Sequence, residues 1–83
     1  MKVYIELYAS LMALLPPGTQ RFRREIIIDE GSSVQQLIDR FSISAELAHI
    51  VLLNGHFVCG DARKQQKLAE EDSVAIWPPV AGG

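Results

Sequence analysis

The sequence has few of the residues from which small proteins build covalent or metal cross-links. Among its 83 residues there is one cysteine, Cys59, and there are two histidines, His49 and His56. A single cysteine excludes an intramolecular disulfide framework, and these three separated side chains are too few to assemble a structural zinc site. We therefore expect no metal site, and the fold has to be stabilised by packing alone.

Long apolar runs and an excess of basic charge are also missing. No stretch is long enough to cross a membrane, and no signal peptide is evident. Together with the lone thiol, these absences favour a cytoplasmic protein. The formal net charge is −2, with ten acidic residues against eight basic ones. This balance argues against nucleic acid as a partner and favours protein partners, with no membrane involved.

Motifs of catalytic machinery are absent as well. The sequence contains no Ser-His-Asp arrangement, phosphate-binding loop or metal-binding motif. Cys59 has no constellation of basic groups around it in the sequence, so a buried or incidental thiol is favoured over a reactive one.

Apolar residues make up 48% of the chain, which is sufficient for the core of one small domain. Two segments, residues 2–8 and 21–29, show the alternation of half-buried strands. In the first, the buried face is expected to hold Val3, Ile5 and Leu7. In the second, it is expected to hold Phe22, Ile26 and Ile28, with the arginines facing solvent. Between them, residues 9–15 predict a short helical turn that a Pro-Pro-Gly sequence ends.

One segment has the periodicity of a helix. Its apolar residues recur at i, i+3, i+4 and i+7 and are Val34, Leu37, Ile38 and Phe41. Ser32 and Ser33 each precede a glutamine by three residues, so either serine can begin the helix with a capping box. Ser44 predicts a second short turn.

The second half of the sequence predicts three further strands. Residues 49–53 form an apolar strand that ends at Asn54-Gly55, a hairpin signal because both positions of a type I′ turn need positive φ. Residues 57–59 form the returning strand of the hairpin. Residues 70–72 form a solvated acidic turn, and residues 74–77 form the last strand. This order predicts an α+β fold, a mixed β-grasp (ubiquitin-like) sheet with one main helix packed across it. The first and last strands would then be central neighbours, although the pattern itself does not determine strand order.

The end of the chain is unsuited to a packed core. Pro78 and Pro79 favour an extended path, and the terminal Gly82 and Gly83 can enter a slot that excludes any larger residue. At about 3.3 Å per residue, this segment reaches roughly 20 Å. We therefore predict a body of residues 1–77 and an extended arm of residues 78–83 that presents the C-terminal carboxylate.

Three segments resemble the MoaD/ThiS family of ubiquitin-like sulfur carriers, which includes the molybdopterin synthase small subunit and the thiamine-pathway carrier ThiS. They are residues 52–55, 68–74 and 76–83, and the resemblance extends over essentially the whole chain. The Pro-Pro-Val-Ala-Gly-Gly ending is more similar to the molybdopterin synthase small subunit than to ThiS. Trp77 departs from that subunit, which commonly has Phe there. Residues 15–18 are similar to less well assigned members, which leaves the pathway open.

The resemblance implies a definite chemistry for Gly83. A ubiquitin-activating-type enzyme would use ATP to adenylate the Gly83 carboxylate, and a sulfur donor of the cysteine desulfurase or rhodanese type would convert the adenylate to a thiocarboxylate. The thiocarboxylate would then deliver sulfur within the large subunit of a molybdopterin synthase. The chain would bind no cofactor and have no independent catalysis. It would be the small subunit and sulfur donor of the complex.

Under this hypothesis the reactive end consists of Gly82 and Gly83. The expected partner-binding residues are Phe57, Trp77, Pro78, Pro79, Val80 and Ala81. For Phe57 a place in the core is at least as compatible with the sequence. Two alternatives stay open, because the same adenylate precedes each of them. One is a ubiquitin-like modifier joined to lysines, and the other is a sulfur carrier for thiamine or another pathway.

Overall fold

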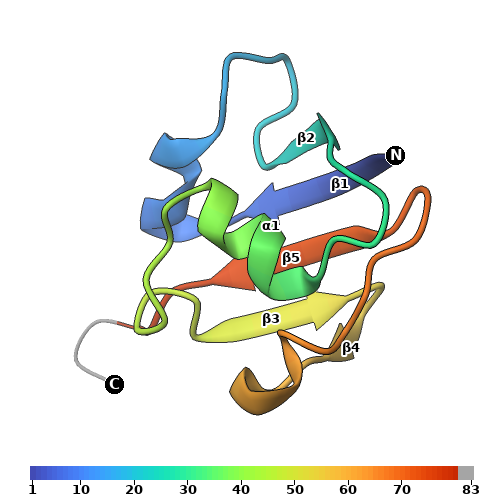
Figure 1. Cartoon of the computed structure of the whole chain (residues 1–83). Coiled ribbons are helices and arrows are strands. Elements are labelled where there is room, and N and C mark those ends of the chain that lie inside the picture. Colours follow the sequence, from blue (N-terminus) through green and yellow to red (C-terminus); the bar gives the residue numbers. More distant parts are fainter. Residues whose placement is uncertain (81–83) are drawn as a thin grey trace.

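The computed structural model describes residues 1–80 and contains one mixed sheet with the strand order β2-β1-β5-β3-β4 (Figure 1). The strands are β1 (Lys2–Leu7), β2 (Arg23–Ile27), β3 (Ile50–Leu53), β4 (His56–Phe57) and β5 (Ser73–Trp77). β1 and β5 are parallel neighbours at the centre, and the other pairs are antiparallel. The predicted β-grasp arrangement, with the first and last strands side by side, is confirmed.

The core lies between this sheet and one helix, α1 (Val34–Arg40), which crosses one face of the sheet (Figure 1). Alternate residues of the strands meet the apolar stripe of α1, as the sequence pattern predicted. The largest fully buried side chains are Val3, Ile5, Leu7, Val34, Leu37, Ile38, Val51, Val74 and Ile76. They form a single cluster, so one hydrophobic core holds the whole domain together.

Two residues expected in this core are more exposed than the pattern indicated. Phe41 is the C-cap of α1 and is only half-buried, because the helix ends there and its ring lies at the edge of the core. Phe22 precedes the first residue of β2 and is only half-buried. Its ring instead lies 4.9 Å from that of Tyr8, between ring centroids.

The start of α1 is fully capped. Ser33, not Ser32, is the N-cap: its hydroxyl accepts the amide of Gln36, and the Gln36 side chain accepts the amide of Ser33. The next two helical amides, those of Val34 and Gln35, donate to carbonyls of the segment 63–66. The first turn therefore has partners for the amides that a helix normally leaves unpaired.

The hairpin between β3 and β4 has the predicted turn, with φ of 50° at Asn54 and 85° at Gly55. The acidic turn before β5 was expected to be simply solvated, but it also makes defined contacts. Asp72 accepts hydrogen bonds from the Asn54 side chain and the Ala69 amide, and Glu70 accepts one from the Lys2 amide. These bonds join the hairpin and β1 to the start of β5.

Two short 3-10 helices complete the fold, η1 (Ala9–Leu14) and η2 (Gly60–Ala62). The loop after η1 is held by Arg24, whose guanidinium donates to the carbonyls of Pro16 and Gln20. A Cβ atom on Gly18 would meet the Arg24 guanidinium, so a glycine there lets the arginine lie across the loop. Within residues 1–80, no helix has the length and apolar character needed to span a membrane.

Candidate docking face and root of the C-terminal arm

The face of the sheet opposite α1 is apolar over β3, β4 and β5. Because successive strand residues point to opposite faces, the neighbours of buried Val51, Val74 and Ile76 point away from the helix, and all of them except Ser73 are apolar. The resulting apolar face consists of Ile50, Leu52, Phe57, Ala75 and Trp77. The strand register places Ile50 opposite Trp77, and Leu52 between Ala75 and Phe57.

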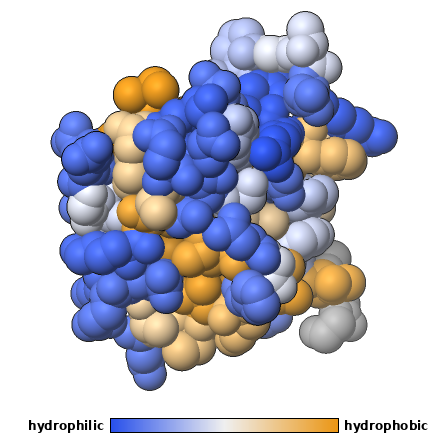
Figure 2. Space-filling model, turned by 90° about the vertical axis from the view of Figure 1, so that its right-hand side faces the viewer, coloured by the Kyte–Doolittle hydropathy of each residue, from blue (hydrophilic) through white to orange (hydrophobic). Residues whose placement is uncertain are grey.

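The apolar face includes side chains that soluble proteins usually cover. Phe57 is 62% exposed and Ile50 is 40% exposed. Figure 2, which views the right-hand edge of Figure 1, shows hydrophobic residues in the middle of the lower half, at the height of β3 and β4, with hydrophilic residues around them. A contiguous exposed apolar surface of this kind indicates an interaction site.

A groove of about 650 Å³ opens at the end of this face, where the chain leaves β5. Its lining is apolar apart from one histidine and consists of His49, Ile50, Leu52, Trp77, Pro78, Pro79 and Val80. The groove is therefore built jointly by strand β3 and by the first residues of the predicted arm.

Trp77 forms the boundary between the groove and the rest of the sheet. Its ring stacks on that of Tyr8, with centroids 4.3 Å apart and planes 2° apart. Its carbonyl accepts a hydrogen bond from the His49 amide at 3.1 Å. The last residue of β5 is thus held on both sides before Pro78, the first residue of the predicted arm.

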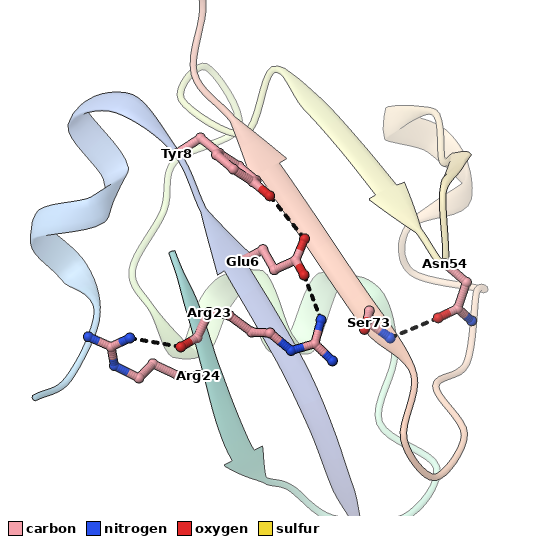
Figure 3. Close-up of polar contacts among 6 residues, drawn as sticks. All are labelled: Glu6, Tyr8, Arg23, Arg24, Asn54 and Ser73. Carbon is pink, nitrogen blue, oxygen red and sulfur yellow. Dashed lines mark hydrogen bonds and ion pairs between the residues drawn. The ribbon is translucent and has the colours of Figure 1, made fainter. Parts of the chain in front are cut away.

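The remaining part of the outer face, over β1 and β2, is polar. The Tyr8 hydroxyl donates to one oxygen of the Glu6 carboxylate at 3.1 Å, and Arg23 donates to the other oxygen at 2.6 Å (Figure 3). Arg23 also lies over the ring of Tyr4, 4.1 Å from its centroid. Burial, reinforced by the hydrogen bond to Glu6 and the negative charge of Glu6, raises the pKa of Tyr8 above its usual value, although Arg23 opposes this shift.

Several predicted site residues are close together in the structure. Trp77, Pro78, Pro79 and Val80 all line the groove. Phe57 is exposed on the adjoining face, so its alternative place in the core is wrong. Ala81, Gly82 and Gly83 lie outside the described residues, and the division between body and arm after Trp77 stays a prediction.

Other residues line the site that the sequence pattern did not identify. Ile50 and Leu52 were expected only as parts of an apolar strand, because four consecutive apolar residues carry no alternation that separates the faces. Tyr8 alternates with the predicted buried face of residues 2–8, but its stacking on Trp77 depends on the parallel register of β1 and β5. The expected neighbourhood of the first and last strands does not give that register.

The residues considered for other chemistry do not form a site. Cys59 is exposed, which excludes the buried position that was one of its two expected places. His49 and His56 are also exposed. Within residues 1–80, no three histidine, cysteine or acidic side chains are grouped so that they would hold a metal ion.

Comparison with known proteins agrees with the fold. A family model described as the ThiS family matches residues 5–83. SAMP1 from Haloferax volcanii has a similar structure, with a TM-score of 0.70, 20% sequence identity and complete coverage of both chains. A candidate molybdopterin converting factor subunit 1 from Pyrococcus furiosus has a TM-score of 0.65 and 21% identity, over 95% of this chain and 98% of that one.

A third similar structure comes from the complex of subunits 1 and 2 of the molybdopterin-converting factor of Helicobacter pylori. Its TM-score is 0.59 at 17% identity, with complete coverage of both chains. Comparison with curated proteins found no match. Because the family model matches almost the entire sequence, the chain belongs to the ThiS family.

Proposed function

We propose that this chain carries sulfur as a thiocarboxylate on Gly83 and donates it in the biosynthesis of molybdopterin. The observation that carries the proposal is the position of β5. This strand is central in the sheet, ends at Trp77 beside an apolar groove, and is followed by Pro78, Pro79 and an 80% exposed Val80. A rigid body therefore supports a short terminal segment next to a surface suited to a partner.

The chemistry requires activation by another protein. A C-terminal carboxylate is ionised at neutral pH, with an ordinary pKa of about 3.3–3.7, and is a poor electrophile. A carboxylate oxygen of Gly83 would attack the α-phosphorus of ATP and displace pyrophosphate. The terminal sulfur of a donor persulfide would then attack the acyl carbon and displace AMP. A thiol would cleave the resulting acyl disulfide and release the thiocarboxylate.

The apolar face and the groove supply the surface on which partners would dock. Their exposed aromatic and aliphatic side chains match the composition of interface centres, which are enriched in aromatic residues and depleted in charge. The similar Helicobacter pylori protein was solved as a complex of subunits 1 and 2. This favours a large subunit as one partner, in whose pocket the arm would deliver sulfur. The adenylating enzyme would be the other.

Intact-mass spectrometry tests the carrier function directly. The purified chain would be incubated with its adenylating enzyme, ATP and a persulfide donor. We expect a mass increase equal to the exchange of one oxygen for one sulfur. Omission of ATP and deletion of Gly83 are the controls, and neither should give the product. If the mass of the chain stays unchanged in the complete mixture under every condition tried, the proposal is contradicted.

A matched pair of variants tests the docking face. Phe57 and Ile27 are similarly exposed, at 62% and 64%, but only Phe57 belongs to the apolar face. We expect Phe57→Ser to weaken binding of the large subunit about tenfold or more. Ile27→Ser should change it less than about twofold. Equal effects in isothermal titration calorimetry would show that the apolar face is not the docking surface.

A ubiquitin-like modifier is the second candidate. It is favoured by the similarity to SAMP1, which is a small archaeal modifier protein. In that function a lysine amine would attack the acyl carbon of the Gly83 adenylate, displace AMP and form an isopeptide bond. Denaturing gels of cell extracts, probed for the chain, separate the two candidates. A ladder of heavier conjugates that disappears on Gly83 deletion favours the modifier, and a single band favours the carrier.

Sulfur supply to thiamine or to another pathway is a variant of the same chemistry. The diproline before Val80 supports molybdopterin over thiamine. Complementation of a strain that lacks its molybdopterin carrier, compared with one that lacks its thiazole carrier, distinguishes the pathways. Rescue of the thiazole-deficient strain alone would overturn the molybdopterin assignment and leave the carrier chemistry intact.

A further inference from the structure

We propose that Tyr8, supported by Glu6 and Arg23, is a positioning residue that clamps Trp77 and thereby sets the direction in which the C-terminal arm leaves the body. This inference rests on the proposed function and adds a part of the molecule that the carrier chemistry does not itself require. Tyr8, Glu6 and Arg23 lie in a row across the outer face of β1 and β2 (Figure 3).

The parallel pairing of β1 and β5 creates the contact. Leu7 and Ile76 are register partners at the end of the pair, and the Tyr8 amide donates to the Ile76 carbonyl at 3.2 Å. Tyr8 and Trp77 are therefore the next residues along the two strands, on the same face of the sheet. The planes of the two rings are nearly parallel, and their centroids are 4.3 Å apart.

The Tyr8 ring is itself fixed at several points. Ala9 has a φ of 52°, so the chain turns sharply directly after Tyr8 and enters η1. Phe22, the residue before β2, packs against the Tyr8 ring, with centroids 4.9 Å apart. The hydroxyl bonds to Glu6, whose second oxygen is occupied by Arg23 at 2.6 Å. A residue held by its backbone, its ring and its hydroxyl has few alternative rotamers.

Trp77 transmits this order to the arm. One side of the Trp77 indole is covered by Tyr8. Trp77 also lines the groove, together with Pro78 and Ile50. A change in the position of the indole would therefore reshape the groove and alter the path of Pro78. An arm that begins in one direction loses less conformational freedom when a partner engulfs it. The clamp should thus act on productive binding of the arm and leave the chemical step unchanged.

Fluorescence provides a readout that is independent of any partner, because Trp77 is the only tryptophan in the chain. We expect Tyr8→Ala to shift the Trp77 emission to longer wavelength and to raise its quenching by acrylamide. Tyr8→Phe keeps the ring and should give a smaller change of the same sign. Tyr4→Phe removes a hydroxyl from the same strand and face, and Ile27→Ala removes an exposed side chain. Both controls should match the wild type.

Steady-state kinetics of adenylation test the functional part, with pyrophosphate release measured against carrier concentration. For Tyr8→Ala we expect KM to rise about two- to tenfold, the range that loss of one aromatic pair allows, with kcat unchanged. Glu6→Gln, which keeps an acceptor for Tyr8 but loses the charge that holds Arg23, should fall between wild type and Tyr8→Ala. Circular dichroism confirms folding, and if Tyr8→Ala does not fold, Tyr8→Phe and Glu6→Gln carry the test.

The outcomes separate this inference from the proposed function. Unchanged emission in Tyr8→Ala would overturn the clamp. A changed emission with unchanged KM would overturn its role in directing the arm, and a fall in kcat alone would do the same. If the wild-type chain is not adenylated at all, the proposed function fails, while the fluorescence still decides whether Tyr8 fixes Trp77.

Discussion

Arg63 is the only buried charged side chain among residues 1–80, with 6% of its surface exposed. Its guanidinium donates to the carbonyl of Ala48 at 2.8 Å and to that of Val58 at 3.3 Å. These contacts join η2 to the loop before β3 and to the residue after β4. The sequence places Arg63 beside Lys64 in a basic group, and arginine is usually exposed, so the pattern alone does not reveal this role.

We expect Arg63→Met to lower the free energy of unfolding by about 1.5–3 kcal/mol, since hydrogen bonds from a charged donor are lost from buried carbonyls. Lys64→Met is the matched control, because its exposed side chain should change stability by less than about 0.5 kcal/mol. Urea unfolding measures both. Equal effects of the two variants would show that the contacts of Arg63 are not stabilising.

Tyr8 makes the free energy of unfolding depend on pH above neutrality. Its pKa is raised in the folded protein by burial and then by Glu6, so the folded state keeps the proton to higher pH than the unfolded chain. The stabilisation that this pKa shift contributes is fully present below the pKa of Tyr8 in the unfolded chain, about 10. It is lost as the pH rises through the pKa of Tyr8 in the folded protein.

The wild type should therefore lose more stability than Tyr8→Phe as the pH rises above about 10. The charged groups nearest the hydroxyl, Glu6 and Arg23, are the same in both proteins. Urea unfolding at a series of pH values gives the difference between the two curves. Curves that stay parallel through this range would contradict the assignment.

The start of helix α1 shows that a capping pattern can occur at two adjacent positions of the sequence although the structure uses only one. The sequence offers two serines with a glutamine three residues later, and either satisfies the capping pattern. The structure uses Ser33, because the bonds from Val34 and Gln35 to the segment 63–66 fix where the helix begins. The hydroxyl of Ser32 instead donates to the Asp29 carbonyl.

Alanine substitution of the two serines should separate their roles. Ser33→Ala is expected to destabilise the protein by about 1 kcal/mol, the usual cost of removing an N-cap. Ser32→Ala, which leaves the capping box intact, should cost less than about 0.5 kcal/mol. Thermal unfolding followed by circular dichroism compares them, and a larger loss in Ser32→Ala would reverse the assignment of the cap.

At the scale of the whole molecule, local pattern predicts the elements and long-range pairing decides the site. The strands, the helix and the Asn54-Gly55 turn follow from periodicity and turn chemistry. The register between strands does not, since residues 2–7 and 73–77 carry no mark of which residues pair. For that reason the sequence does not predict the stacking of Tyr8 on Trp77, although it leads us to expect the first and last strands as neighbours. The apolar run of β3 similarly conceals which of its side chains face outward.

Deletion of Gly83 tests the division between a folding body and a functional arm. The buried cluster extends from Val3 to Ile76, so removing the last residue should leave the melting temperature unchanged within about 1 °C. Thiocarboxylate formation should be abolished. Differential scanning calorimetry and mass spectrometry of the same sample give both results. A fall of several degrees would mean that the terminal residue stabilises the body.

The parallel pair of β1 and β5 also constrains how the protein folds during its synthesis. The second central strand is made almost 70 residues after the first, so the emerging polypeptide cannot complete its sheet until translation has reached Trp77. Contacts between such distant segments form late, because a long loop has to close before they add stability. A ribosome that stops early releases a chain without its middle strand, which proteases can remove. Cells would then accumulate only copies whose synthesis continued at least through β5.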